Sequence, residues 1–575
     1  MATTSTEHQA GTPAADSSRR AFFLKTALAA AAPMLLTARK SSARDDSLDI
    51  PASPPTTPFA DELPVPPVKT PVGSPADYQG GAVNPAAHQY YNLSPPKKFY
   101  ETFVRAAEHR FHRDLPPSTI WGHDGIYPGP IFHARYGEPV LNRIHNELPL
   151  DASTFGMPQI ITHLHNFHSA AESDGGPFDF YDTGQHLDHH YNMAYAGFDS
   201  SHPGLGDPRE ALNTLFYHDH RPDFTAPNVY KGLVGFFLAF DPVDSGDETD
   251  ANPQALRLPS GEFDVPLLFA DKAFDRDGRL FFDPFDFDGF LGDKDTVNGV
   301  IQPFFRVKRR KYRFRMLVGG PARFYDFYLR KGGAFLKQPF IQIANDGNLL
   351  PAPVRRNNLL ISVAERFDVV IDFSEIAQPG DEIVLYNRAE QTDGRQPSGK
   401  LLNPGNPVLK FIVGETVPDP SQVPDILREQ PVVDLNAVVR TRLFRFERGN
   451  GAWQINGKFF DPDVSLARPR RNTAEIWIFE NKSGGWSHPI HVHMEEFFIL
   501  SRNGRPPPVY ERGRKDVVRL GPNETIKTFR YFRDFPQPGF VPPGVSPFTV
   551  GRYVIHCHNM THEDHAMMAR WDVAP

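Results

Sequence analysis

The sequence predicts an all-β protein built from three similar domains of the β-sandwich or β-barrel kind. The chain has 575 residues, which is too long for one hydrophobic core. It contains 57 prolines and 44 glycines, as expected for many short strands joined by turns rather than for long helices. Hydrophobic residues make up 40% and charged residues 23%, as in ordinary soluble globular proteins.

A weak internal repeat is the second observation that predicts three domains. Segments beginning at Asp124, Asn298 and Asn456 each open with an Asx-Gly pair and continue through a short apolar stretch into alternating apolar residues. Asx-Gly followed by alternation is a hairpin signal. The segments FDVVIDF (367–373) and IWIFEN (476–481) indicate further strands. Pro-rich connections near 246–260 and 414–432 then predict domains at 89–248, 249–418 and 419–575.

The N-terminal residues 1–43 are predicted to be a signal peptide. Ser18-Arg19-Arg20-Ala21-Phe22 precedes the short apolar run TALAAAAPMLLTA, and this order resembles a twin-arginine export signal. An ordinary secretory signal or an uncleaved anchor is the alternative. We expect an exported protein, periplasmic or extracellular, without stable membrane insertion after cleavage. Residues 44–88 are rich in Pro, Ser and Asp and are predicted to form a tether or a surface strap.

Charge and cysteine content narrow the class of protein. The net charge of −8 gives no electrostatic reason to expect a nucleic-acid partner. The single cysteine, Cys557, excludes an internal disulfide. It lies in the segment VIHCHNMTHEDHAMM, between two histidines, which suggests a chemical rather than a structural role.

The 23 histidines are distributed unevenly along the chain. None occurs between His220 and His488, so the predicted middle domain has none. In the rest of the chain many histidines form H-x-H pairs, and on a strand such a pair directs its two imidazoles to the same side. Imidazole is a common metal ligand. The pattern therefore predicts metal sites assembled from the first and third domains, at His163 and His165, His218 and His220, His491 and His493, and His556 and His558.

The H-C-H triplet predicts two different centres on opposite sides of one strand. On an extended segment His556 and His558 face one way and Cys557 faces the other. A thiolate with two imidazoles and a weak thioether is the ligand set of a blue copper electron-transfer site. Cys557, His562 and Met567 lie on one short stretch, and His488 can supply the second imidazole. The remaining eight paired histidines suit a second, polynuclear cluster.

Taken together, the motifs HLH, HDH, HPIHVH and HCHNMTHEDHAM resemble, in order, the copper motifs of the multicopper oxidases. The segments HRDLPPSTIWGHDGIYPGP, YHDHRPDFTAPNVYKGLVGFFLAFDP and KYRFRML are similar to the branch of bacterial spore-coat laccases and bilirubin oxidases. The resemblance runs from about Phe59 to the C-terminus. It implies three cupredoxin-like Greek-key β-barrel domains and four copper ions per chain.

The resemblance also implies a role for each motif residue. One type 1 copper is expected at His488, Cys557 and His562, with Met567 as the axial ligand. The type 2 copper is expected at His163 and His491. The type 3 pair is expected at His165, His218, His220, His493, His556 and His558. Glu563 and Asp174 match family carboxylates that pass protons to the cluster; the alternative is that both only orient ligand histidines.

Several positions depart from the family pattern. Asn166 stands where glycine is usual, and His168 follows it. Phe216 stands where an aromatic residue, often Trp, is expected. The insert GQHLDHHYN brings together His186, His189 and His190, and we expect a solvated loop, with an accessory metal site or a substrate lid as alternatives. His565 and Met568 lie at the wrong distance from Cys557 and are left out of the site.

The predicted activity is a laccase-like oxidation of phenols, aromatic amines or bilirubin-type pigments, coupled to the reduction of dioxygen to water. A small-molecule reductant and dioxygen are the expected partners, and the expected state is a monomer. A metallo-oxidase acting on Mn(II), Cu(I) or Fe(II) is the alternative. A cuprous oxidase is disfavoured because the nine methionines form no cluster away from the axial position. A copper-free structural relative is disfavoured because every ligand position is filled.

Overall fold

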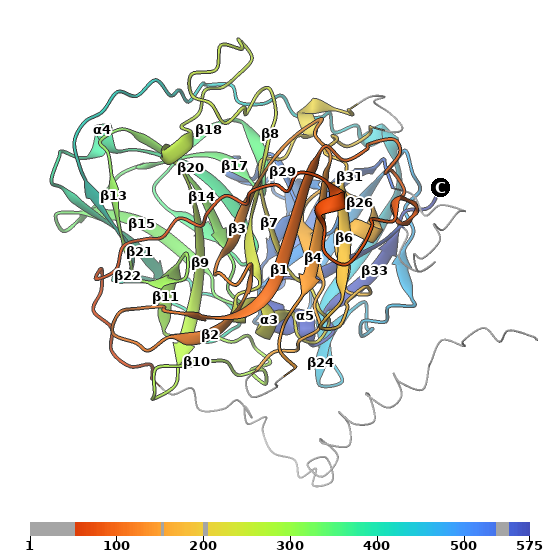
Figure 1. Ribbon diagram of the computed structural model, residues 1–575, viewed down its shortest axis with the longest axis horizontal. Coiled ribbons are helices and arrows are strands. Elements are labelled where there is room, and N and C mark those ends of the chain that lie inside the picture. Colours follow the sequence, from red (N-terminus) through yellow and green to blue (C-terminus); the bar gives the residue numbers. More distant parts are fainter. Residues whose placement is uncertain (1–51, 151–154, 199–204, 536–550) are drawn as a thin grey trace, which may run out of the picture. The chain divides into compact units, whose positions relative to one another are not determined.

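The computed structural model describes residues 52–150, 155–198, 205–535 and 551–575. The predicted signal peptide, with its cleavage site, and the start of the predicted tether lie outside the described residues. Most described elements are strands, which confirms the all-β prediction (Figure 1). The described helices are short, and none is long and apolar enough to span a membrane.

The first pair of sheets has the strand orders β2-β1-β4-β6 and β3-β8-β7-β5. Strand β8, VGFFLAF, is buried along its whole length, as expected for an apolar run without alternation. The strands are β1 (Lys98–His109), β2 (Ser118–His123), β3 (Gly129–Arg135), β4 (Val140–Asn146), β5 (Thr162–His165), β6 (His186–Tyr191), β7 (Thr214–Asp219) and β8 (Val234–Phe240). Two short helices, α2 (Ala171–Asp174) and α3 (Thr225–Lys231), lie in the connections.

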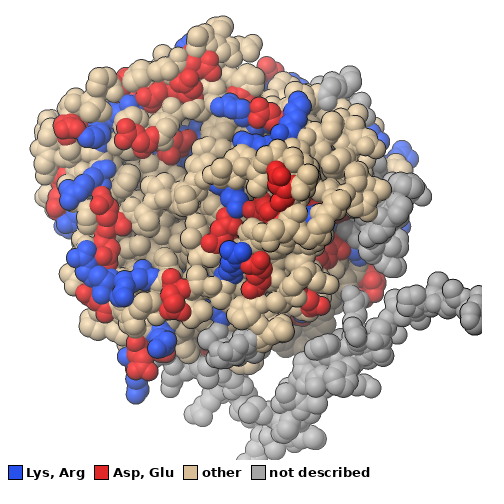
Figure 2. Space-filling model, in the orientation of Figure 1, with Lys and Arg blue, Asp and Glu red and all other residues tan. Residues whose placement is uncertain are grey.

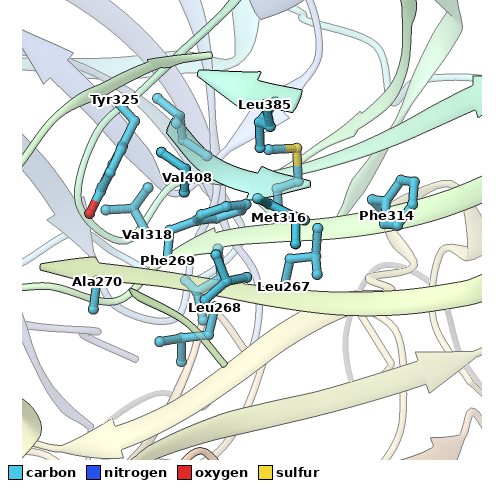
Figure 3. Close-up of a cluster of buried hydrophobic side chains, with 14 of the residues drawn as sticks. Leu267, Leu268, Phe269, Ala270, Phe314, Met316, Val318, Tyr325, Leu385 and Val408 are labelled. Carbon is cyan, nitrogen blue, oxygen red and sulfur yellow. The ribbon is translucent and has the colours of Figure 1, made fainter. Parts of the chain in front are cut away.

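The second pair of sheets has the orders β12-β11-β9-β14-β20-β17-β18, with β10 beside β9, and β13-β22-β21-β15-β16, with β19 beside β15. Figure 3 shows its core, where Leu267, Met316 and Leu385 come from different strands. The elements are β9 (Asp264–Phe274), β10 (Leu280–Phe281), β11 (Lys294–Val297), β12 (Val300–Ile301), β13 (Phe304–Val307), β14 (Lys311–Val318), β15 (Tyr325–Lys331), β16 (Ala334–Phe335), β17 (Phe340–Asn345), β18 (Asn348–Arg356), β19 (Leu359–Ile361), β20 (Arg366–Asp372), α4 (Phe373–Ile376), β21 (Glu382–Ala389) and β22 (Leu401–Val413).

The third pair of sheets has the orders β24-β23-β26-β31-β28-β29 and β25-β33-β32-β27-β30. The predicted strand 476–481 belongs to β26, and the predicted strand 367–373 matches β20 except for Phe373, which begins α4. The elements are β23 (Val438–Gly449), β24 (Ala452–Ile455), β25 (Ser465–Ala467), β26 (Thr473–Asn481), β27 (His488–Val492), β28 (Phe497–Arg502), β29 (Arg514–Lys515), β30 (Val517–Leu520), β31 (Thr525–Phe532), β32 (Arg552–Cys557), α5 (Met560–Asp564) and β33 (Met568–Asp572).

The three predicted Asx-Gly turns have the backbone that this dipeptide favours. At Asn298-Gly299 the φ angles are 47° and 79°, and the flanking residues pair as the hairpin β11–β12. At Asn456-Gly457 they are 54° and 71°, and Ile455 bridges to Lys458. The pair that begins at Asp124 also has positive φ at both residues. Two consecutive positive φ angles are the mark of a type I′ turn, which Asn and Gly tolerate best.

The described part of the predicted tether or strap, residues 52–88, contacts more than one sheet. Glu62 forms a bridge with Phe304 of β13, and Val68 forms one with Ile131 of β3. The side chain of Leu63 is buried in the main hydrophobic core. This stretch therefore packs along the first two pairs of sheets.

The histidine-rich insert differs from its prediction. The expected solvated loop is wrong, because the residues form strand β6, which pairs with β4. His189 and His190 are buried, and each ring binds a backbone carbonyl, of Ser173 and Ser94 respectively. Adjacent residues of a strand face opposite sides, so the burial of both rings means that both faces of β6 are covered at this end. Sequence reasoning missed this because histidine and aspartate made the segment look polar.

Surface charges carry no single dominant sign on the face shown in Figure 2, where acidic and basic side chains are interspersed. Other ion pairs are buried. Arg313 of β14 donates to Asp244, which follows β8, at 2.8 Å, and to Asp368 of β20 at 3.0 Å. Burial would raise the pKa of Asp244, but the nearby guanidinium groups, Arg313 first, hold it at about 2. This ion network joins the first and second pairs of sheets.

Removal of the Arg313 guanidinium should destabilise the fold strongly. We expect Arg313→Met to lower the free energy of unfolding by about 3–5 kcal/mol, because two buried carboxylates would lose the cation that lies between them. Arg306→Met is the matched control, since its side chain is 66% exposed and its ion pair with Glu62 spans 3.9 Å; there we expect a change within about 0.5 kcal/mol. Urea denaturation measures both, and equal effects would contradict the ionic explanation.

Candidate metal centres

The first candidate centre surrounds the single cysteine. Cys557 ends β32, and its Sγ lies 3.4 Å from His488 Nδ1 and 3.6 Å from His562 Nδ1. The two Nδ1 atoms are 3.2 Å apart. His488 begins β27, His562 lies on α5, and all three side chains are fully buried. Met567 is also fully buried and packs in the same core cluster as Cys557.

The outer nitrogens of these two imidazoles are held by hydrogen bonds. Ser483 Oγ lies 2.7 Å from His488 Nε2, and the Asp288 carbonyl lies 3.1 Å from His562 Nε2. Each contact leaves the Nδ1 of the ring facing Cys557. Trp453 of β24 covers His562, with ring centroids 4.0 Å apart. Asp288, Ser483 and Trp453 were not found by sequence reasoning, because nothing in their local sequence indicates the contact.

The second candidate centre is built from four strand segments. Strands β5 and β7 place His163 opposite His218, and β27 and β32 place His491 opposite His556. Three pairs of ring nitrogens approach closely: His165 and His218 at 3.4 Å, His220 and His493 at 3.2 Å, and His493 and His556 at 3.3 Å. The histidines of the cluster, all fully buried, are His163, His165, His218, His220, His491, His493, His556 and His558.

Backbone carbonyls and carboxylates fix the orientation of this cluster. His163 Nδ1 donates to the Asp174 carbonyl, His218 Nδ1 to the Asp219 carbonyl at 2.8 Å, and His491 Nδ1 to the Asp516 carbonyl at 3.1 Å. In each of these three rings, Nδ1 is thereby hydrogen-bonded. Among the buried nitrogens without a partner are Nε2 of His163, Nε2 of His491 and both nitrogens of His558.

Three carboxylates contact the cluster. Asp174, at the end of α2, accepts from His493 Nδ1 at 2.8 Å, and Glu563 of α5 lies 3.1 Å from His556 and 3.3 Å from His220. Asp516 lies 3.0 Å from His165 Nε2 and is paired with Arg366 of β20 at 2.6 Å. The first two were predicted to lie beside the cluster. Asp516 was missed, because only the folded chain brings it to His165.

Burial controls the protonation of these groups. It lowers the pKa of His488 and His218 to about 3, so both rings are neutral and offer a lone pair. Burial raises the pKa of Asp174 well above its ordinary value. Burial also acts to raise the pKa of Glu563, but His556 and His220 outweigh it and lower the pKa.

The donor sets fit copper. Two nitrogens bound to one ion at about 2 Å come roughly 3.3 Å apart, which is close to the spacings of the facing nitrogens. A thiolate with two imidazoles suits a soft copper site, and neutral imidazoles suit a cluster of copper ions. The inward nitrogens without partners would be costly if nothing bound them.

The departures from the family pattern have local explanations. Asn166 has a φ of 67°, a conformation that glycine adopts readily and asparagine tolerates, and its amide donates to the Asp346 carbonyl at 2.7 Å. His168 points away from the cluster and binds Asp534. Phe216 stacks on His165 at 4.3 Å. His565 contacts Phe287 rather than Cys557.

Known proteins share this sequence and fold. A family model of the multicopper oxidases matches residues 433–575. A bilirubin oxidase from Albifimbria verrucaria is 34% identical over 526 residues, which cover 89% of this chain and 81% of that protein. A laccase from Bacillus subtilis is 30% identical over 579 residues, which cover 90% of this chain and 98% of that protein.

The fold is also that of a known oxidase structure. The crystal structure of a laccase from Pediococcus acidilactici aligns with a TM-score of 0.69 at 24% identity, covering 91% of this chain and 95% of that one. This likeness confirms the predicted cupredoxin-like fold. From its identity to the two relatives over most of its length, the chain belongs to the multicopper oxidase family, copper-containing oxidoreductases that use dioxygen as the electron acceptor.

Proposed function

We propose that this chain binds four copper ions and oxidises phenols, aromatic amines or bilirubin-type pigments one electron at a time. The observation that carries the proposal is the juxtaposition at β32. Cys557 lies within 3.6 Å of His488 and His562, while its neighbour His556 lies 3.3 Å from His493 in the histidine cluster. One strand therefore connects a mononuclear site to a polynuclear one.

Each centre has a distinct set of donors for copper. His488, Cys557, His562 and Met567 would hold one ion, and the eight cluster histidines would hold three. Bound copper would supply one-electron acceptance at the first site and four-electron reduction of dioxygen to water at the second. The chain keeps the two sites separate, because alternation directs Cys557 to the apolar core and its flanking histidines to the other side.

Protons must reach the buried cluster, and we assign that role to two carboxylates. Glu563 lies against His556 and His220, and Asp174 lies against His493, so the two approach the cluster at different histidines. Asp174 Oδ2 accepts from His493 Nδ1, and the buried Oδ1, which has no hydrogen-bond partner among the described residues, would be the atom that holds a proton. Both residues also orient their histidines, which is a separate contribution.

A basic and aromatic surface around the partly exposed Trp486, which the buried Trp453 separates from His562, supports an organic reductant. Trp453 packs on His562, and Trp486 packs edge-on against Trp453 at 5.4 Å. The guanidinium groups of Arg395 and Arg448 lie over the Trp486 ring. Aromatic and guanidinium faces stack well on planar organic molecules. Oxidation of Mn(II), Cu(I) or Fe(II) is the alternative activity.

Domain organisation and localisation are part of the same proposal. The three consecutive pairs of sheets support domains at 89–248, 249–418 and 419–575, with no copper ligand in the middle domain. The export signal at Ser18–Lys25, and with it a periplasmic or extracellular location, stays a prediction, as does the monomeric state.

Copper content tests the ligand assignment. Wild-type protein after full loading should hold four copper ions and show a strong blue absorption band. Cys557→Ser should lose the band and one ion and keep three, because a hydroxyl is a poor ligand for this site. His565→Gln, three residues after His562 on the chain, is the control and should keep four ions. A wild-type chain with one ion or none would overturn the mechanism.

Oxidation kinetics test the proton donors. Glu563→Gln should lower kcat by about 10²–10⁴-fold and alter its pH profile, because the amide cannot deliver a proton. The copper content of this variant should stay unchanged. Glu172→Gln is the matched control, since Glu172 is also buried but binds Gln89 instead of a cluster histidine. An unchanged pH profile in Glu563→Gln would reduce Glu563 to an orienting residue. Oxidation of Mn(II) and of no organic reductant would favour the metallo-oxidase alternative.

A further inference from the structure

A cavity of about 610 Å³, open to solvent on one side, lies in the third pair of sheets, outside both candidate metal centres. Its volume falls within the range of about 300–1,000 Å³ that is usual for small-molecule sites. Met568 and Arg570 of β33 form one side, and β24 with the following segment 456–464 forms the other. None of the residues assigned to copper or to proton delivery lines it.

One polar side chain that lines the cavity has no partner among the described residues. The side chain of Gln454 is only 5% exposed and lines the cavity. Within the described parts of the chain, its amide forms no hydrogen bond to another residue. The side chain is nine-tenths buried, and its amide faces the solvent of the cavity, where it is free to donate to and accept from a bound molecule.

The remaining lining is largely apolar. Phe459, Phe460, Val464 and Met568 contribute aromatic and aliphatic surface. Arg570 offers no free charge, because its guanidinium donates to Asp572 at 2.7 Å and to the Pro462 carbonyl at 3.0 Å.

The charges at the cavity favour a neutral ligand. Lys458 and Asp461 both line it, and their opposite charges offset one another. An aromatic ring suits the apolar walls, and a single hydroxyl can both donate to and accept from an amide.

We propose that this cavity is a binding site for a neutral monocyclic phenol. The hydroxyl would bond to the Gln454 amide, and the ring would pack against Phe459 and Phe460. Met568 follows Met567 in sequence and pairs with His556 across the sheet, so the bound molecule would contact the strand beside both candidate metal centres. The proposal concerns binding alone and goes beyond the proposed oxidation.

Calorimetric titration of the full, copper-free chain with p-cresol and with toluene tests the proposal. The two probes share a methylated ring and differ by one hydroxyl. We expect p-cresol to bind at least about tenfold more tightly than toluene, because only the hydroxyl satisfies Gln454. Gln454→Met keeps the length of the side chain and removes the amide. This substitution should weaken the binding of p-cresol about tenfold and change the affinity for toluene by less than about twofold.

A second variant tests the cavity independently of Gln454. Val464→Trp should fill the cavity and weaken the binding of both probes by at least about tenfold. Val509→Trp is its control, because Val509 is a similarly exposed valine, at 55% against 40%, in the short helix Val509–Glu511, which does not line the cavity. The affinities for both probes should stay unchanged. The proposal is overturned if p-cresol does not bind, if Gln454→Met leaves the p-cresol preference intact, or if Val464→Trp has no effect.

The same titration separates this proposal from the proposed function. Because no copper is present, binding cannot depend on turnover. A chain that binds p-cresol through Gln454 and oxidises no phenol when loaded with copper would support the cavity and contradict the proposed substrate class. A chain that oxidises phenols when loaded with copper, but binds no p-cresol in the copper-free state, would support the proposed substrate class and contradict the cavity.

Discussion

The alternation of side chains along β32 is the constraint on which the candidate centres depend. Successive residues of a strand face opposite sides, so Cys557 enters the core of the third pair of sheets while His556 and His558 face the histidine cluster. The two centres are thereby joined by one residue of backbone without sharing a side chain. A one-residue shift of this strand against β27 would exchange the two faces and destroy both centres.

The candidate centres also require that the imidazoles are correctly oriented. The groups that orient them come from distant parts of the chain. Ser483 and the Asp288 carbonyl hold the rings beside Cys557, and Asp174 and Asp516 hold rings of the cluster. In each case one ring nitrogen is bound outward, so the other faces a neighbouring ligand. Hydrogen bonds of this kind fix the tautomer and the direction of a metal-binding histidine.

The second pair of sheets contributes no histidine and still shapes both centres. Arg366 of β20 pairs with Asp516, which in turn contacts His165. The loop that carries Asp288 covers His562, and the Asp346 carbonyl anchors Asn166 beside the first H-x-H pair. The region is therefore a support for ligands that other parts of the chain supply. The buried pair of Arg313 and Asp244 helps to hold it against the first pair of sheets.

The sequence by itself determined the all-β class, the Asx-Gly turns and the candidate ligands Cys557 and His562 on one short stretch. These follow from local rules: period-two alternation, turn chemistry and donor spacing act over a few residues. His488 is 69 residues from Cys557 and is assigned to the same site through the resemblance to the family motifs. Only the tertiary structure decided the roles of Asp516, Asp288 and Trp453, because their contacts join segments far apart in sequence. It also decided that the histidine-rich insert is a buried strand, since pairing with β4 outweighs the polar character of its side chains.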